Sequence, residues 1–240
     1  MRNKYEEGYV AQRRKGAEKT HRNAAAPGGI APLRERASQL VTITTKNPPT
    51  QIKNRLQTGT TNQLTIDKGA LEKELHVAVK GEVRFGGADR GMYASDASNY
   101  RMVPLGVILP TDADDVVSAV SVCRKYGAPI FARGGGTAIP GQTVNDGVLF
   151  DFSKYMNRIH ELDPETKRAR VEPGVVLDSL RDAANKHSLT FGPDPATHSR
   201  CTLGGMIGNN SCGVHSVMAG ETSDNIDELE ILTYDGTRMR

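Results

Sequence analysis

The sequence predicts a mixed α+β fold that begins near residue 67 and follows a long polar leader. Three patterns support this prediction: an apolar strand, a capped helix and a second apolar strand over 102–132; two strand patterns joined by a turn over 158–172; and a helical apolar stripe over 176–184. With 37% hydrophobic residues among 240, the chain can build a core over part of its length.

The leader, residues 1–66, has no sustained apolar period, so we expect it to be disordered. Residues 1–55 hold twelve Lys or Arg against four Asp or Glu, a net charge of +8, and the remainder carries −5. Basic segments can attract nucleic acid or anionic membrane, but this one lacks the interleaved aromatic residues and the motifs of nucleic-acid binding. A solvated tail is therefore the favoured interpretation.

The three cysteines, Cys123, Cys201 and Cys212, form no CxxC pair, so the sequence predicts a reducing compartment and no metal site. No apolar run approaches the roughly 20 residues that span a bilayer. We expect no transmembrane segment and a cytoplasmic location, with peripheral contact to the inner membrane through a redox partner left open.

A leading helix and loop are expected over 67–100, ahead of the main domain at 101–240. Asp67 should begin the helix, and Gly81 should end it. One face of this helix carries the residues expected to be buried, namely Leu71, Leu75, His76 and Val79. The stretch 86–100 is expected to be an ordered loop anchored by Tyr93 and Tyr100.

The pattern over 102–109 predicts a strand, and 129–132 predicts a second strand, short and buried. Between them, Thr111 is expected to cap a helix that Gly127 closes. Its predicted buried stripe is Ala113, Val116, Val117, Val120 and Cys123.

Strands are further expected at 148–152, 158–162 and 168–172, followed by a helix that ends near His187. The buried stripe of that helix is Val176, Leu177, Leu180 and Ala184. A loop-rich stretch over 191–224 leads to a last strand over 226–234, followed by the turn Asp235-Gly236.

The first stretch with chemical potential is 133–142, Arg-Gly-Gly-Gly-Thr-Ala-Ile-Pro-Gly-Gln, directly after a strand. Consecutive glycines let the backbone turn tightly and gather N–H groups into a nest that suits phosphate oxygens. An ordinary glycine-rich turn is the alternative on glycine content alone. Neither a P-loop pattern nor the dinucleotide pattern GxGxxG is present.

The second stretch combines GPDP at 192–195 with TLGG at 202–205 and NNSCG at 209–213. Its small residues leave room for a flat or extended ligand, and its hydroxyl and amide groups can form hydrogen bonds. A tight packing site is the alternative. Two such stretches about seventy residues apart are harder to explain by packing than either alone.

These segments, together with IDELEILTYDGT at 226–237, resemble the successive FAD-contacting segments of the vanillyl-alcohol oxidase or p-cresol methylhydroxylase (PCMH) type of flavin domain. They are most similar to the branch of glycolate oxidase, D-lactate dehydrogenase and D-2-hydroxyglutarate dehydrogenase, especially the long bacterial FAD-linked oxidases with iron-sulfur clusters. The resemblance covers about 71–240 and implies two α/β subdomains with FAD between them.

The resemblance also assigns cofactor-binding residues. The pyrophosphate loop would comprise Arg133, Gly134, Gly135, Gly136, Thr137, Gly141 and Gln142. The wall along the ribityl chain and isoalloxazine would comprise Pro193, Thr202, Gly204, Gly205, Asn209, Asn210 and Gly213, and Ile226 would touch the adenine. Thr137 stands where some relatives have a histidine bonded to the flavin, so non-covalent FAD is expected.

Three further polar residues, His215, Asp96 and Tyr100, are left out of the site. No partner carboxylate can be assigned to His215, and the roles of Asp96 and Tyr100 are ambiguous.

The activity that the resemblance implies is oxidation of a D-2-hydroxy acid (lactate, glycolate or 2-hydroxyglutarate) by hydride transfer to flavin N5. In such relatives the catalytic residues and iron-sulfur ligands lie in later domains, so we expect a fragment with a truncated second subdomain and a separate C-terminal portion or partner chain. No catalytic residue is assigned. The alternatives are a non-catalytic FAD-binding subunit and an NADPH-dependent reductase of the UDP-N-acetylenolpyruvoylglucosamine type.

Overall fold

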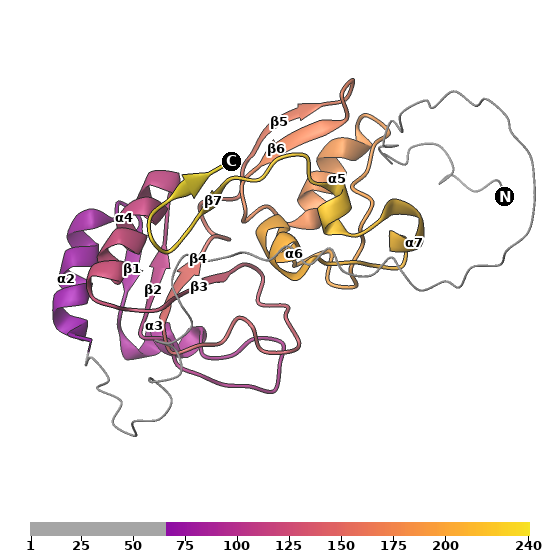
Figure 1. The fold of residues 1–240 in the computed structure, drawn as a ribbon. Coiled ribbons are helices and arrows are strands. Elements are labelled where there is room, and N and C mark those ends of the chain that lie inside the picture. The colour runs from indigo at the N-terminus through magenta and orange to yellow at the C-terminus, as the bar shows by residue number, and fades with distance from the viewer. Residues whose placement is uncertain (1–65) are drawn as a thin grey trace, which may run out of the picture. The chain divides into compact units, whose positions relative to one another are not determined.

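The structure, a computed structural model, describes residues 66–240 (Figure 1). The predicted disordered leader, 1–66, lies outside the described residues apart from Ile66. The described part combines one four-stranded sheet with two small two-stranded sheets and short helices, as the predicted α+β class requires.

The first sheet consists of β1 (Glu82–Arg84), β2 (Gly106–Leu109), β3 (Ile130–Arg133) and β4 (Val148–Asp151) in the order β1-β2-β4-β3. β2 and β3 run parallel to β4, and β1 runs antiparallel to β2. The predicted strand, helix and strand are present as β2, α4 (Ala113–Lys125) and β3. However, β4 lies between β2 and β3 in the sheet. β2 begins at Gly106, four residues later than predicted.

The two central strands are buried on both faces. Ile108 and Phe150 point into a cluster shared with α2 (Lys68–Ala78) and α4 (Ala113–Lys125), which lie together on one side of the sheet (Figure 1). Val107, Leu109 and Leu149 form a smaller cluster on the other face. This alternation follows from the two-residue period of a strand.

Helix α2 begins as predicted, because the Asp67 side chain accepts a hydrogen bond from the N–H of Ala70 at 3.0 Å. Leu71, Leu75 and Val79 are buried, but His76 is exposed, so its predicted place in the stripe is wrong. The helix ends at Ala78. Gly81 instead permits a close approach to β2, since a Cβ on it would lie 2.1 Å from the carbonyl oxygen of Leu109.

Helix α4 is capped by Asp112 and not by Thr111, because the Asp112 carboxylate accepts from the N–H of Asp115 at 2.9 Å. The predicted stripe is also shifted. Val117 is 36% exposed, and the buried residues are Asp115, Ala119, Val120, Val122 and Cys123. Gly127, with φ of +65°, follows the helix end as predicted.

Two further predictions for the part of the chain that forms the four-stranded sheet need correction. The 86–100 loop contains a short helix, α3 (Gly87–Met92), and only Tyr93 is firmly anchored, whereas Tyr100 is 64% exposed. Strand β3 is partly exposed because it pairs with β4 alone and forms the edge of the sheet.

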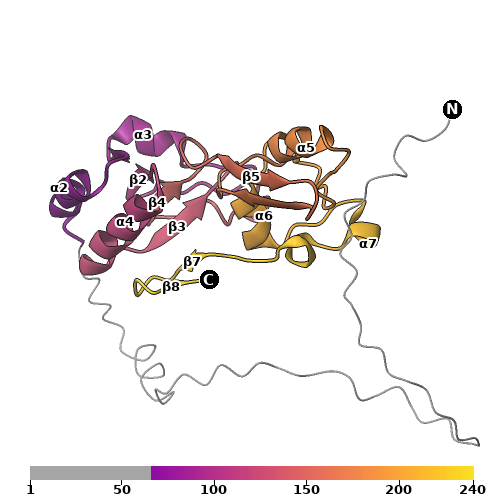
Figure 2. The ribbon, with the colours of Figure 1, turned by 90° about the horizontal axis from the view of Figure 1, so that it is seen from above.

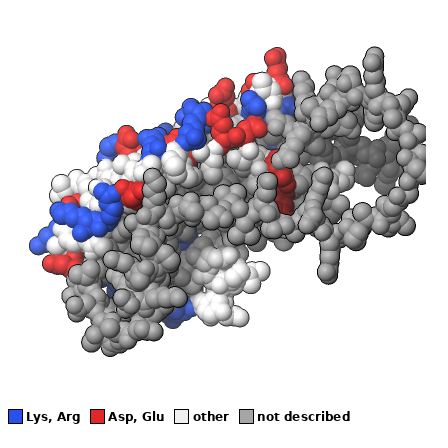
Figure 3. Space-filling view, in the orientation of Figure 1, with Lys and Arg blue, Asp and Glu red and all other residues white. Residues whose placement is uncertain are grey.

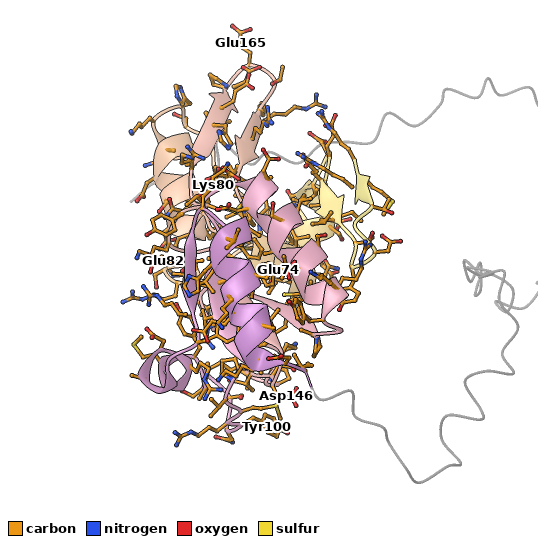
Figure 4. The ribbon with its side chains drawn as sticks, turned by 90° about the vertical axis from the view of Figure 1, so that its left-hand side faces the viewer. Glu74, Lys80, Glu82, Tyr100, Asp146 and Glu165 are labelled. Atoms are coloured by element: carbon orange, nitrogen blue, oxygen red, sulfur yellow. The ribbon has the colours of Figure 1, made fainter. Side chains whose placement is uncertain are left out.

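The second region starts with the hairpin of β5 (Ile159–Asp163) and β6 (Arg168–Val171), near whose tip Glu165 lies (Figure 4). Helix α5 (Leu177–Asn185) buries Leu177, Leu180 and Ala184, as predicted, but Val176, which was also predicted in this stripe, is the half-buried residue just before the helix. These side chains belong to or adjoin a cluster that is separate from the first core and comprises Val175, Leu177, Leu180, Cys201, Leu203 and Met206.

The loop-rich stretch 191–224 contains α6 (Leu203–Asn209), α7 (Ser216–Ala219) and most of a 3-10 turn, η1 (Thr222–Asn225). The predicted last strand survives only as β7 (Ile231–Leu232), which pairs with β8 (Arg238–Met239). The Tyr234 hydroxyl donates to the carbonyl of Ala128 at 2.9 Å, so this hairpin lies beside the start of β3 (Figure 2).

Charged side chains of both signs are interspersed over α4 and the β5–β6 hairpin (Figure 3). The described residues on this face therefore form no extended field of one sign. Within residues 66–240, none of the helices has the length and apolarity needed to cross a membrane.

Candidate functional site

The glycine-rich stretch 133–142 leaves the carboxyl end of β3, the edge where parallel sheets commonly bind ligands. Gly136 has a φ of +64°, which a nest conformation of the backbone requires. Among the described residues, the N–H groups of Gly134, Gly135, Gly136 and Thr137 have no hydrogen-bond acceptor. The loop therefore offers unpaired donors to an anion.

The structure brings the two predicted stretches together. A Cβ on Gly134 would lie 2.0 Å from Oγ1 of Thr202, and one on Gly135 would lie 2.2 Å from the carbonyl oxygen of Arg200. Further along the loop, Nε2 of Gln142 donates to Oδ1 of Asn209 at 3.1 Å. The first two glycines are thus required by direct contact between the two regions.

Arg133 does not extend freely into the loop. Its guanidinium donates to the carbonyl oxygens of Ser95 at 2.9 Å and Thr143 at 3.4 Å, and it lies 5.6 Å from the ring centre of Tyr93. A Cβ on Gly136 would lie 2.6 Å from its Nη2. The positive charge is therefore held beside the nest by groups outside it.

Gly141, with φ of +86°, lies against the Tyr100 ring, since a Cβ there would be 2.5 Å from the ring. Thr137 is half-buried. The loop thus closes onto a segment, residues 93–101, that the sequence did not place in the site.

The Thr202 side chain is buried and caps α6 by accepting from the N–H of Gly205 at 3.3 Å. Gly204 serves packing, because a Cβ on it would lie 2.8 Å from the Cβ of Pro173. Tight packing against Pro173 therefore explains why residue 204 is a glycine.

Asn209 and Asn210 fix the end of α6. Asn210 adopts the left-handed conformation with φ of 45°, donates to Glu221 at 2.5 Å and accepts from the N–H of Ser223 at 2.9 Å. A hollow of about 300 Å³ adjoins these residues. It is lined by Ile207, Asn210, Thr222, Ser223, Ile226, Asp227, Glu228 and Leu229. Ile226 therefore lies beside Asn210, and the other predicted wall residues do not line this hollow.

The GPDP segment is held from two sides. Arg181 of α5 donates to the carbonyl oxygens of Phe191 at 3.0 Å and Pro193 at 3.5 Å. On the other side, a Cβ on Gly213 would lie 2.1 Å from the carbonyl oxygen of Asp194. Pro193 and Gly213 are thus joined through this segment, although neither contacts the 133–142 loop through any of these interactions.

His215 has a carboxylate partner, which contradicts the expectation that none could be assigned. Asp194 accepts from the His215 N–H at 2.9 Å and pairs with its Nδ1. Burial raises the pKa of the Asp194 carboxyl, but hydrogen bonds from His215 outweigh this effect and leave the pKa below its ordinary value. Sequence spacing of 21 residues gave no sign of the pair.

A model of the protein family described as "FAD binding domain" matches residues 104–240. The chain belongs to this FAD-binding family. FAD is therefore its cofactor.

Two relatives and one solved structure are informative. The chain is 35% identical over 172 residues to a protein named D-2-hydroxyglutarate dehydrogenase from Pseudomonas putida, covering 70% of this chain and 17% of that protein. It is 35% identical over 144 residues to glycolate oxidase subunit GlcD from Escherichia coli, covering 59% of this chain and 29% of that protein. The chain thus spans less than a third of the length of these relatives.

Among solved structures, alkyldihydroxyacetonephosphate synthase superimposes with a TM-score of 0.65 at 22% identity, over 72% of this chain and 38% of that chain. This likeness shows the fold alone. The predicted PCMH-type fold and the predicted cofactor are both confirmed.

Proposed function

We propose that this chain is the FAD-binding part of a dehydrogenase that oxidises a D-2-hydroxy acid. The observation that supports the proposal most is the direct contact between the nest at 133–142 and the α6 region, within a chain similar to D-2-hydroxyglutarate dehydrogenase and glycolate oxidase proteins. FAD, when bound, would supply a hydride acceptor for the α-carbon of the hydroxy acid.

In this proposal, the N–H groups of Gly134, Gly135, Gly136 and Thr137 bind the pyrophosphate. Their unpaired state among the described residues supports this role. Gly141 and Gln142 hold the loop closed, the latter through Asn209. Arg133 contributes nearby positive charge without occupying the nest.

The proposed wall of the site has two kinds of members. Thr202, Gly205, Asn209 and Asn210 keep α6 in place through caps and hydrogen bonds. The second kind leaves room for the cofactor or makes backbone contacts, and it comprises Pro193, Gly204, Gly213 and Ile226. For Ile226, the adjoining hollow supports a role at the adenine end.

We further propose that the cofactor is held without a covalent bond, because the position expected to carry a flavin-linked histidine holds Thr137. Denaturing the purified holoprotein should release all flavin into the supernatant. Flavin that remains with the precipitated chain would contradict this part of the proposal.

The test of the function starts from the purified full chain, reconstituted with FAD and examined for flavin absorbance. D-lactate, glycolate and D-2-hydroxyglutarate are then added separately without oxygen, with the L-enantiomers of lactate and 2-hydroxyglutarate as matched controls. Bleaching by glycolate or by a D-enantiomer, without bleaching by the matching L-enantiomers, supports the proposal. Bound flavin that no hydroxy acid bleaches would instead favour an FAD-binding subunit without turnover, and a chain that takes up no FAD would overturn the site.

A further inference from the structure

Residues 93–101, which precede the part matched by the family model, lie against the proposed pyrophosphate loop. We propose that this segment, here called the support segment, holds the loop in its binding conformation and that Asp96 is its principal positioning residue. The inference rests on the proposed role of 133–142 in binding FAD. It concerns positioning, since Asp96 acts through Thr143 and the backbone and is not assigned a contact with the cofactor.

The support segment contacts the start of the loop through the backbone. The N–H of Ala97 donates to the carbonyl of Gly136 at 3.0 Å, and the carbonyl of Ser95 accepts from Arg133 at 2.9 Å. Because the carbonyl of Gly136 is fixed in this way, the adjacent peptide groups of the nest have a defined orientation. The turn of the nest therefore depends on residues about forty positions earlier.

Asp96 extends the same support to the far end of the loop. Its Oδ2 accepts from the Thr143 hydroxyl at 2.7 Å, and its Oδ1 accepts from the N–H of Ser98 at 2.8 Å. Burial raises the pKa of Asp96, but the hydrogen bonds from Ser98 and Thr143 outweigh burial and leave the pKa below its ordinary value. The carboxylate is therefore charged at neutral pH and accepts both bonds.

A second line of contacts fixes Arg133 between the segment and the sheet. The guanidinium lies over the ring of Tyr93, and the Tyr93 hydroxyl donates to Asp151 of β4 at 2.8 Å. Tyr100 lies on the exposed surface of the segment (Figure 4). Its ring lies against Gly141, since a Cβ there would be 2.5 Å from the ring. The support segment therefore contacts the loop at its first residue, within the nest and near its end.

Such support matters because a loop with three consecutive glycines has many conformations when free. Ordering these conformations on binding would weaken FAD affinity, whereas a loop already ordered in the apoprotein avoids that loss. Removing the Asp96 to Thr143 contact should therefore weaken FAD binding more than it weakens the fold.

The experiment measures the dissociation constant for FAD by flavin fluorescence titration of the full-length apoprotein, together with its thermal midpoint. Asp96→Ala and Thr143→Val should each weaken FAD binding about ten-fold, because each removes the same hydrogen bond. Thr143→Ser keeps the hydroxyl and should restore wild-type affinity. The double variant should bind no more weakly than Asp96→Ala, since the two groups act through one bond.

Asp146→Asn, an exposed change between the loop and β4, is the matched control and should bind like the wild type. If the wild type binds FAD and Thr143→Val binds equally well, the support role is overturned while the FAD site stands. A fall in thermal midpoint without loss of affinity would likewise overturn it. If the wild type itself takes up no FAD, the proposed function fails and the inference fails with it.

Discussion

Gly134 shows at the scale of one residue why the loop sequence is so restricted. A Cβ at this position would lie 2.0 Å from Oγ1 and 3.1 Å from Cβ of Thr202, whose side chain is buried. Thr202 cannot give way easily, because it also caps α6. The absence of a side chain is thus dictated by tertiary contact as well as by backbone flexibility.

We predict that Gly134→Ala separates the loop from α6, destabilises the protein by about 1–3 kcal/mol and weakens FAD binding about ten-fold or more. Urea unfolding and flavin titration would measure the two effects. Gly91→Ala in α3 is the control, since a Cβ there meets nothing within 4 Å. Equal affinity of Gly134→Ala and the wild type would show that the loop does not need this close approach.

The three cysteines should differ sharply in reactivity. Cys123 is fully buried, and burial raises its pKa to about 12; burial also raises the pKa of Cys201, which is 5% exposed. Cys212 is exposed. Because the thiolate is the reactive form, a thiol reagent should label one cysteine rapidly in the native protein and all three after denaturation.

Labelling of Cys212 should also slow when FAD is present, because it lies between Asn210 and Gly213 of the proposed wall. Peptide mapping of the labelled chain would identify the site. Rapid labelling of Cys123 in the native protein would contradict the buried position of this residue on α4.

At the scale of elements, Asp115 joins α4 to the segment between α2 and β1. Its carboxylate accepts from the N–H groups of Lys80 at 2.8 Å, Gly81 at 3.0 Å and Thr111 at 2.9 Å, and from the Thr111 hydroxyl at 2.6 Å. Lys80 lies just beyond the end of α2 (Figure 4). One buried acid thus fixes the connection between two helices and the sheet.

We predict that Asp115→Ala destabilises the protein by about 3 kcal/mol, because it removes four hydrogen bonds to a buried carboxylate and leaves the part-buried N–H donors of Lys80, Gly81 and Thr111 without this acceptor. Asp115→Asn keeps the shape and one acceptor and should cost less. Chemical denaturation at neutral pH would rank the variants, and Asp114→Asn, an exposed neighbour, should match the wild type.

The same carboxylate predicts a pH dependence. Burial raises the pKa of Asp115, but the hydrogen bonds from Thr111, Lys80 and Gly81 outweigh burial and lower the pKa. A lowered folded-state pKa stabilises the protein above the unfolded value, about 3.9, and that contribution is lost as pH falls through the folded-state pKa. Wild-type stability should therefore fall in acid more than that of Asp115→Asn, as denaturation curves at several pH values would show.

At the scale of the whole molecule, the described residues form three apolar clusters, one on each face of the first sheet and one around α5 and α6. The proposed FAD-binding loop belongs to the first region and contacts the second. A ligand bound along this contact should stabilise both regions together, because it binds the folded state only.

FAD at a hundred times its dissociation constant should therefore raise the thermal midpoint by about 5–10 °C for a protein of this size. Removing the flavin by dialysis should reverse the change. A midpoint independent of FAD concentration, despite measured binding, would show that the unfolding transition does not report on the FAD-binding regions.

Much of the secondary structure could be predicted from local patterns. Asp67, Gly127 and three of the four residues of the α5 stripe were placed correctly, because caps and helical periodicity depend on neighbours within one or two turns. The cap of α4 was placed one residue too early, although its partner is local, and the exposure of β3 was missed because it depends on a strand that comes later in the sequence. Thr111 donates to the buried Asp115, and the insertion of β4 leaves β3 at the edge.

The sequence by itself determined the glycine-rich loop, the order of its motifs and the resemblance to a flavin domain, since these lie in short runs of residue types. Only the tertiary structure decided which glycines are fixed by contact, that Asp194 pairs with His215, and that Asp96 supports the loop. Gly134 and Thr202 are 68 positions apart, Asp96 and Thr143 are 47 apart, and Asp194 and His215 are 21 apart, and no local pattern specifies a distance in space between such residues.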